Sequence, residues 1–292
     1  MINKDHDFFR ISTKNKSDKK IIEKKLGKVL IKNNYEDFNK YDVLPLLINN
    51  FSLRFLEQNK EIRREFIDYF LFHVKHDYLE KLKRFKKILF SRNKALRENN
   101  KDQISVWTKF LIESSIEINI LRERIVNEVL EDLEENILKK LEDKRWVEIL
   151  STLEISFFSG WKGDSLKEQL REEYEEDLIK GFTKSGAHKF DLEIKVLGEK
   201  SGNILSRGEQ KLLILLVFLS FGEFFAKTKN KNLIYLIDDL ASELDPKNLN
   251  LALQFLDITK GQKIITSVKK IENKSIKQLI LSLIHISEPT RL

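Results

Sequence analysis

One stretch restricts the fold of this chain more than any other. The polar heptapeptide LSRGEQK runs directly into eight consecutive apolar residues, 212–219. This run is too short to span a bilayer, because a helix that crosses one needs about 20 such residues. It also lacks the polar face that a surface helix shows. We therefore expect a core helix that is buried on all sides, with its polar first turn held rigidly at the surface.

The rest of the C-terminal third predicts a parallel sheet around that helix. Residues 233–237, LIYLI, form an uninterrupted apolar run that suits a strand buried on both faces. Strand and helix candidates alternate here, as they do in α/β folds. The strand candidates here are residues 190–197, 232–237 and 263–268. Residues 1–50 look mixed, with short strand candidates at 28–31 and 41–48.

The middle of the chain is predicted to be a helical insertion. Glycine is absent from residues 28–159 and only three prolines occur in the chain, so little forces a helix to break. A helix from residue 105 to 144 would be about 60 Å long, and it could be an arm or a surface helix of an ordinary bundle. Helices are expected over 57–144, with turns near 73–77 and 99–104, and over 166–178.

The composition is that of a globular, helix-rich protein, with 41% hydrophobic and 34% charged residues. The 53 basic side chains against 46 acidic ones give a net charge of +7, which suits an anionic partner. The absence of cysteine excludes disulfides and thiolate metal sites. The N-terminal residues lack the apolar segment of a signal peptide. We expect a cytoplasmic protein without a membrane partner.

Two adjacent carboxylates, Asp238 and Asp239, end the apolar strand candidate. Ligands of open parallel sheets bind beyond the carboxyl ends of the strands, so these acids lie where a ligand would bind. One carboxylate there could hold Mg²⁺ and the next could orient a water molecule for phosphoryl transfer. A solvated Asp-Asp turn is an equally good interpretation of the dipeptide alone.

The polar turn before the core helix suits a phosphate. Ser206 is a good N-cap, and Gly208 would let a ligand approach the backbone closely. Free N–H groups and the helix dipole attract an anion at such a helix start. Taken by itself, Ser-x-Gly at a helix start is a common and weak signal.

The two motifs together resemble a known family. LSRGEQK, followed 27 residues after Gln210 by the end of the strand, and then DD and SELD, resembles the signature motif, Walker B strand and D-loop of ABC-type ATPases. More narrowly, the order is similar to that of the RecF family, DNA replication and repair ATPases of the SMC-like branch. Further stretches, among them SVWTKFL and KGFTKSGAHKFDLEI, follow in the order of that family. The resemblance covers roughly residues 25–270 and implies an ABC-type ATPase head.

The resemblance also implies roles for the matching residues. Asp238 would serve Mg²⁺, and Asp239 would be the catalytic acid. The signature would contact the γ-phosphate of ATP held by the opposite protomer, so that ATP clamps a homodimer on DNA. Recombination-mediator proteins would be partners, in replication, recombinational repair and the SOS response. The signature residues would be Leu205, Ser206, Gly208 and Gln210, and the D-loop residues Ser242 and Asp245.

Several positions depart from the family pattern. Arg207 stands where many ABC proteins have glycine, and Glu209 where RecF proteins usually have glutamine. The segment GAHKFD keeps Gly186 and His188 of a Gly-Pro-His-Arg pattern. The strand KIITSV reaches the switch position without the histidine of ABC transporters, which argues mildly against a transporter subunit.

No P-loop sequence, G-x-x-x-x-G-K-[ST], occurs in the chain. In RecF-like proteins this loop opens the N-terminal lobe, so we expect that about 60 preceding residues are missing here. We also expect that this chain alone neither binds ATP tightly nor hydrolyses it. The predicted division is a remnant of the N-terminal ATPase lobe (1–55), a helical lobe or arm (56–180), a C-terminal ATPase lobe (181–280) and an artefactual tail (281–292).

One segment, residues 81–97, carries eight basic residues and no acidic one. On a helix its apolar residues gather on one side, with a basic stripe opposite. Such a stripe predicts sequence-independent, salt-sensitive binding to single- or double-stranded DNA. A solvated lysine face or a helix on a membrane surface would show the same pattern. The stripe consists of Lys83, Lys86, Lys87, Lys94 and Arg97.

Other interpretations stay open. A different SMC-like head would carry a far longer coiled-coil insertion than the roughly hundred residues expected here. A non-catalytic DNA or protein interaction module could keep the signature half without a P-loop. The DNA site could also involve Arg63 and Arg64, or the sheet lobe.

Overall fold

The computed structural model describes residues 8–14, 19–25, 28–30, 43–48, 55–56, 60–230, 232–241 and 244–267. The predicted tail at 281–292 lies outside the described residues. So does Ser242 of the predicted D-loop.

A three-stranded parallel sheet forms the base of the ATPase-like part. Its strands are β4 (Val43–Ile48), β8 (Asn232–Ile237) and β9 (Gln262–Ile265), in the order β4-β8-β9. The central strand β8 was predicted with these bounds, and Leu233, Tyr235 and Ile237 are buried. The prediction of a parallel sheet in an α/β fold is thus confirmed.

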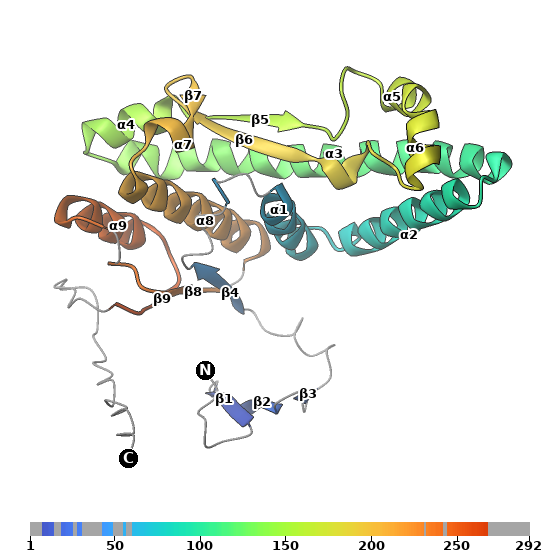
Figure 1. The fold of residues 1–292 in the computed structure, drawn as a ribbon. Coiled ribbons are helices and arrows are strands. Elements are labelled where there is room, and N and C mark those ends of the chain that lie inside the picture. Colours follow the sequence, from blue (N-terminus) through green and yellow to red (C-terminus); the bar gives the residue numbers. More distant parts are fainter. Residues whose placement is uncertain are drawn as a thin grey trace, which may run out of the picture.

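Helix α8 (Arg207–Lys229) lies on this sheet, with α9 (Pro246–Ile258) beside it and α1 (Lys60–Val74) in the same layer (Figure 1). Every residue from 212 to 219 is buried. The sheet covers one side of α8, and further helices cover the other, so the apolar run needs no polar face. The expectation of an all-round buried helix is confirmed.

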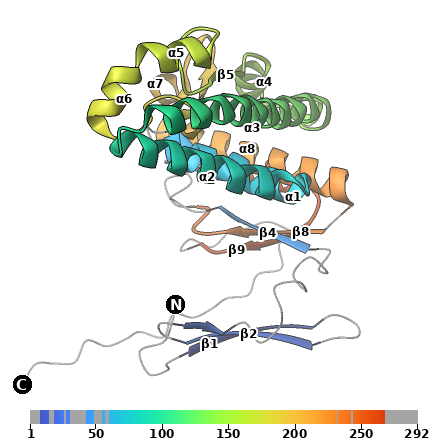
Figure 2. The same ribbon diagram turned by 90° about the vertical axis from the view of Figure 1, so that its right-hand side faces the viewer.

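Two long helices form a hairpin. Helix α2 (Tyr78–Arg97) continues the layer beyond α1, and α3 (Lys101–Asn136) lies over it (Figure 1). At 36 residues, α3 is about 54 Å long and crosses most of the molecule (Figures 1 and 2). It packs against α1, α2 and α8, and it buries apolar side chains from Ile104 to Leu133. The long helix is therefore a packed layer of the fold over most of its length.

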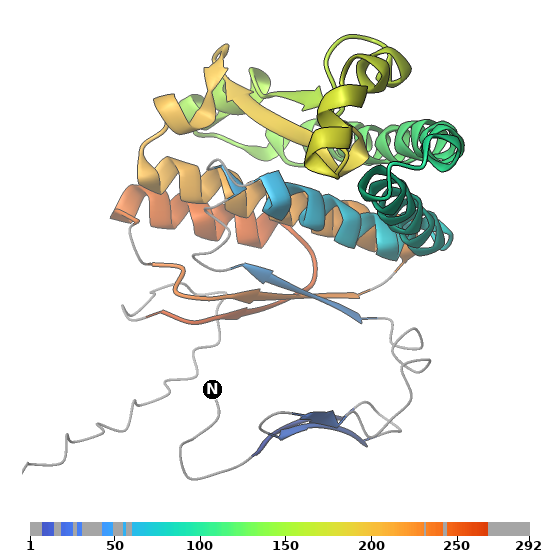
Figure 3. The same cartoon turned by 45° about the vertical axis from the view of Figure 1, so that its right-hand side comes forward.

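A second sheet is antiparallel and lies over α3 (Figure 3). It consists of β5 (Glu154–Phe158), β6 (Asp191–Val196) and β7 (Glu199–Lys200). The prediction that residues 190–197 form a strand of the parallel sheet is wrong. Leu192, Ile194 and Val196 alternate with less buried residues, as expected for a sheet with one covered face.

Other boundaries also differ from those predicted. The helix expected to reach residue 144 ends at Asn136. It is followed by the turn η3 (Leu138–Lys140) and helix α4 (Lys144–Ser151). The side chain of Asp143 caps α4 by accepting a hydrogen bond from the Trp146 N–H group.

The acidic helix expected over 166–178 is two short helices, α5 (Leu166–Glu172) and α6 (Tyr174–Lys180). The remaining elements are a three-stranded antiparallel sheet, the turn η4 (Ala187–Lys189) and α7 (Ser201–Ile204). The strands of that sheet are β1 (Phe8–Lys14), β2 (Lys19–Lys25) and β3 (Lys28–Leu30). The division into lobes stays a prediction; the β5–β6 ladder joins residues on both sides of its 180/181 boundary.

Candidate functional site

The two predicted acids lie at the carboxyl edge of the parallel sheet. The Asp238 N–H group donates to the carbonyl oxygen of Ile48, the last residue of β4 (2.8 Å). The exposed Asp238 carboxylate accepts a hydrogen bond of 2.6 Å from the Thr266 hydroxyl group, just beyond β9. The ends of all three strands therefore meet around Asp238, as the position of the acids in the sequence predicts.

Asp239 adopts a left-handed backbone conformation, with φ of +51°. Such a conformation is uncommon outside glycine, and it persists where the surroundings fix it. Here the Asp239 N–H group donates to Thr266 Oγ1 (2.9 Å). Two backbone hydrogen bonds, from Thr266 N to Ile237 O and from Leu240 N to Thr266 O, tie the same segments together.

Thr266 is thus a clamp on the acid pair that the sequence did not predict. It belongs to the predicted strand KIITSV, in which the sequence shows only that the switch histidine of ABC transporters is absent. Its hydroxyl group accepts from one acid's backbone and donates to the other's carboxylate. A hydroxyl group can make both hydrogen bonds because it donates one and accepts another. A threonine at the end of a strand beside the acids is therefore the signal that could have indicated this role.

The predicted signature turn is the capped N-terminus of α8. The Ser206 hydroxyl group accepts from the Glu209 N–H group (3.3 Å), and the Glu209 carboxylate accepts from the Ser206 N–H group (2.9 Å). This reciprocal pair is a capping box, in which glutamate and glutamine serve equally. Gln210 Nε2 donates to the Leu205 carbonyl oxygen (2.8 Å) and closes the turn.

Arg145 of α4 holds the side of this turn. Its guanidinium donates to Glu209 Oε1 at 2.9 Å. Partial burial opposes ionisation of Glu209. The hydrogen bonds from Ser206 and the charge of Arg145 nevertheless keep the pKa of its carboxyl group below the usual value. The turn therefore carries an ionised, immobilised glutamate.

A hydrogen bond joins the turn to the acid pair. Lys211 Nζ, in the first turns of α8, donates to the Asp239 carbonyl oxygen at 2.9 Å. The capped tip of the core helix and the acids at the strand end therefore lie side by side. The sequence predicts both motifs, but it does not predict the lysine that links them.

The described part of the predicted D-loop also lies beside α4. Asp245 is the N-cap of α9 and accepts from the Asn248 N–H group (2.8 Å), with Pro246 at the first helical position. Lys247 Nζ lies 3.4 Å from the Asp143 carboxylate at the start of α4. Helix α4 is thus linked by ion pairs to both the signature turn and the D-loop helix.

The predicted basic stripe is exposed on α2. Lys83, Lys86, Lys87, Lys94 and Arg97 all lie on the solvent side, opposite the buried Phe85, Ile88 and Leu96. The alternative DNA site at Arg63 and Arg64 is less accessible. Arg63 is buried and pairs with Asp191 (2.7 Å), and Arg64 donates to the Phe190 carbonyl oxygen (2.9 Å).

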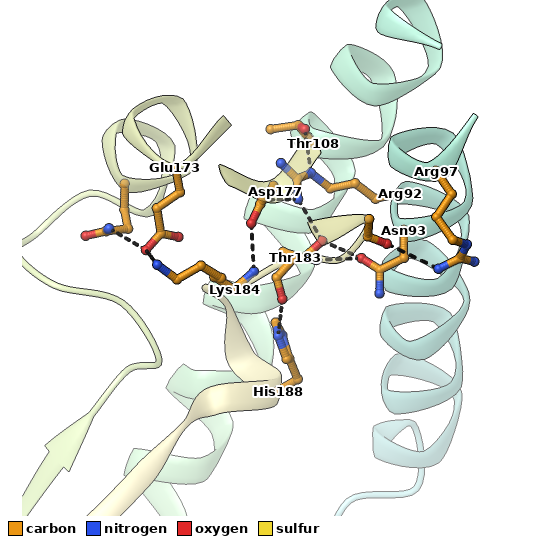
Figure 4. A network of polar contacts seen from close by, with 11 residues as sticks. Arg92, Asn93, Arg97, Thr108, Glu173, Asp177, Thr183, Lys184 and His188 are labelled. Atoms are coloured by element: carbon orange, nitrogen blue, oxygen red, sulfur yellow. Dashed lines mark hydrogen bonds and ion pairs between the residues drawn. The ribbon is translucent and has the colours of Figure 1, made fainter. Parts of the chain in front are cut away.

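A buried polar network underlies α2 (Figure 4). Arg92 is fully buried and donates to Asp177 (2.8 Å), to Thr183 (2.7 Å) and to Thr108 (2.9 Å). Asn93 Oδ1 accepts from the Thr183 N–H and hydroxyl groups. The role of Arg92 was not predicted from the sequence. It could have been recognised because this arginine falls on the apolar side of the helix.

The GAHKFD segment follows this network. The Gly186 N–H group donates to the Gly160 carbonyl oxygen (3.0 Å). The two backbone segments approach so closely that a Cβ atom at Gly160 would lie 2.1 Å from the Gly186 carbonyl oxygen. His188 Nε2 lies 3.1 Å from the Thr183 carbonyl oxygen. Burial lowers the pKa of His188 to about 4, which keeps the imidazole neutral. The GAHKFD segment therefore has a structural role in packing against α2.

The described residues contain no group of three or more His, Cys, Asp or Glu side chains arranged for a metal ion. Magnesium takes few protein ligands when it is bound with phosphates. The exposed Asp238 carboxylate at the sheet edge fits that kind of site. None of the described helices has the length and apolar character that crossing a membrane requires.

Comparison with curated proteins shows what this arrangement resembles. No family model matches the chain. The chain is 35% identical over 231 residues to the DNA replication and repair protein RecF of Stutzerimonas stutzeri, which covers 78% of this chain and 60% of the relative. It is 31% identical over 232 residues to that of Teredinibacter turnerae, with the same coverage.

In sequence, the chain is similar to RecF proteins. It spans about 60% of the length of the curated RecF proteins that it matches.

Solved structures agree in fold. The RecF–ATP structure of the recombination mediator protein in the RecFOR pathway matches with a TM-score of 0.66 at 18% identity. It covers 87% of this chain and 69% of the solved one. The structure described as RecF-ATPrS matches with a TM-score of 0.66 at 21% identity, over 91% and 76%. The predicted ABC-type head fold is that of RecF.

Proposed function

We propose that this protein is a RecF-like, ATP-dependent DNA-binding protein of DNA replication and recombinational repair. The observation that carries the proposal is the contact between Lys211 and Asp239, which unites the capped turn with the acid pair. Curated relatives are named DNA replication and repair proteins, and a solved relative is described as bound to ATP.

In this proposal the capped turn faces ATP held by a second copy. The N-terminus of α8 offers backbone N–H groups and the positive end of a 23-residue helix dipole to a phosphate. Glu209 adds a negative charge there, but Arg145 neutralises it. The residues that would face the nucleotide are Leu205, Ser206, Gly208 and Gln210.

The acids of the copy that holds the ATP would act at the same phosphate. Asp238 would hold Mg²⁺, which supplies charge neutralisation when bound, while Thr266 fixes the orientation of its carboxylate. Asp239 would orient the attacking water, with its backbone fixed on both sides by Thr266 and Lys211. Ser242 and Asp245 would cross the interface between the two copies.

Binding of ATP would thereby stabilise a homodimer on DNA. The basic stripe on α2 would supply contacts to phosphates without regard to sequence. Recombination-mediator proteins are the proposed partners, since a solved relative is described in the RecFOR pathway. The second candidate is a DNA-binding module that needs no nucleotide, which the exposed basic stripe on α2 would support equally.

A hybrid protein tests this function. The part of the Stutzerimonas stutzeri RecF that this chain matches would be replaced by the corresponding residues of this chain. We expect the hybrid to hydrolyse ATP and to dimerise on DNA only with ATP and Mg²⁺.

Variants of the hybrid separate the two candidates. Asp239→Asn should lower hydrolysis at least about 100-fold while ATP-dependent dimerisation persists. The matched control Asp257→Asn lies in α9 outside the proposed site and should leave both unchanged. DNA binding that is the same with and without ATP in the hybrid would favour the interaction module and refute the proposal.

A further inference from the structure

The basic stripe of α2 surrounds an aromatic side chain that has no place in an electrostatic surface. Phe90 is 64% exposed. It lies three or four residues from Lys86, Lys87 and Lys94. These residues are its neighbours on one helix face.

Phe90 cannot turn inward to the core. The opposite side of α2 packs Phe85, Ile88 and Leu96 against the core, with Arg92 in its buried network. The helix is therefore fixed in rotation, and Phe90 points away from the protein. A solvated lysine face gains nothing from a phenylalanine at its centre, because exposed apolar area is unfavourable in water.

A second exposed aromatic borders the same face. Phe182 is 44% exposed and lies in the segment that the network holds beside α2. On one side of it, Arg97 donates to the Gly181 carbonyl oxygen (3.2 Å), and on the other the Thr183 N–H group donates to Asn93 (2.8 Å). Figure 4 shows Arg97, Asn93 and Thr183 at this junction.

The described carboxylates leave most of the positive charge of this face unpaired. Across the described residues, no carboxylate forms an ion pair with Lys83, Lys86 or Lys87. Lys94 has one distant partner, Glu98 at 3.7 Å, and both side chains are at least half exposed. The face therefore offers both charge for phosphates and aromatic rings for an apolar surface.

We propose that this face of α2 binds single-stranded DNA, with Phe90 stacking on an unpaired base while the lysines contact the phosphates. The proposal rests on the DNA binding proposed above and assigns a strand type to it. Positive surfaces with exposed aromatic rings are typical of single-strand binding, since every base has a face on which a ring can stack. In a duplex the base faces are already stacked and are not available to a ring on a convex helix.

The test is the affinity of the 292-residue chain for a labelled 20-nucleotide oligothymidine and for a 20-base-pair duplex, measured by fluorescence anisotropy. Phe90→Ala should weaken single-strand binding about tenfold and change duplex binding less than twofold. Phe90→Trp, which keeps a stacking surface, should retain the affinity. The matched control is Phe72→Ala on α1, which removes a ring of 42% exposure outside the basic stripe.

The joint replacement of Lys83, Lys86 and Lys87 by Gln separates this proposal from the one on which it rests. It should weaken binding to both the single strand and the duplex, and it should flatten the salt dependence of binding. If it does so while Phe90→Ala changes nothing, the aromatic role is refuted and the DNA face stands.

Three other results would also overturn the proposal. An equal loss for duplex and single strand in Phe90→Ala would indicate contact with a duplex groove. Binding to vesicles containing anionic lipid that depends on Phe90, without DNA binding, would assign the face to a membrane surface. If neither the lysines nor Phe90 affects DNA binding, the DNA face of the proposed function fails as well. All variants lie on the surface, so unchanged thermal unfolding confirms that they fold.

Discussion

Gly222 of α8 lies against the ring of Tyr235 in the central strand of the parallel sheet. A Cβ atom at Gly222 would lie 2.5 Å from the Tyr235 hydroxyl oxygen and 2.9 Å from its Cε1 atom. Tyr235 is fully buried, so its ring has no room to move aside. The sequence shows this position only as a glycine that interrupts an apolar helix.

We predict that Gly222→Ala lowers the free energy of unfolding by about 1–3 kcal/mol, measured by urea denaturation. Helix propensity alone would favour alanine by about 1 kcal/mol. The sign of the change in unfolding free energy therefore distinguishes the packing effect from the propensity effect. The control is Gly202→Ala, where the nearest atom lies 4.0 Å from the new Cβ. Equal or greater stability of Gly222→Ala would show that α8 and β8 are farther apart than described.

His188 predicts a pH dependence of stability. Burial lowers its pKa to about 4, whereas the unfolded chain titrates near the usual value of about 6.5. Between these values the unfolded chain takes up a proton and the folded chain does not. Stability from this group is therefore complete above pH 6.5, and it is lost as the pH falls toward 4, by at most about 3 kcal/mol.

The measurement compares urea unfolding of the wild type and of His188→Gln from pH 7 to pH 4. The variant should lose less stability on acidification, because it lacks the buried imidazole. The acidic side chains titrate in both proteins, so their contributions cancel in the comparison. The exposed His76 supplies the control, since His76→Gln should follow the wild type. Parallel pH profiles for wild type and His188→Gln would contradict the buried, neutral imidazole.

At the scale of elements, the start of α8 combines a helix cap with a proposed phosphate contact. Ser206→Ala removes the cap and should cost about 1 kcal/mol of stability. Ser206→Asp keeps a capping oxygen and should preserve stability, but it places a negative charge where the proposal puts a phosphate. In the hybrid protein, Ser206→Asp should therefore abolish ATP-dependent dimerisation while its urea midpoint stays near that of the wild type. Unimpaired dimerisation would remove the phosphate role and leave only the cap.

The elements that the sequence predicted well carry local signals. Helix α8 and strand β8 are marked by uninterrupted apolar runs, and the N-cap of α8 by Ser206. Strand β6 was placed in the wrong sheet because partner choice depends on which face is covered. Helix α3 ended early because Asp143 starts a new helix, α4, and a periodic pattern alone does not show such a break.

The links between elements could not be predicted from local patterns. Thr266, Lys211 and Arg145 each join segments that are far apart in the sequence, and a lysine or threonine at such a position looks like any other. Arg92 is the exception, because its place on the apolar side of α2 already required a buried partner. The sequence therefore indicates the components of the site, and long-range hydrogen bonds arrange them.

Across the whole molecule, one hydrophobic core joins the parallel sheet, α8, α1 and the C-terminal half of α3. The N-terminal part of α3 carries α2 and its basic face, and α4 returns to the capped turn of α8. The proposed DNA face and the proposed nucleotide face thus lie on one continuous helical layer. This arrangement suits a protein in which nucleotide and DNA binding are coupled.

The central claim is that the capped turn of α8 and the acid pair share one surface, and the absence of native cysteine allows a direct measurement of it. Cysteines introduced as Lys211→Cys and Asp239→Cys would be treated with a short bismaleimide, and the products mapped by mass spectrometry after proteolysis. We expect an intramolecular crosslink between the two positions in the folded protein, lost when urea unfolds it. A folded protein in which both cysteines react singly and no crosslink forms would show that the turn and the acid pair do not share one surface.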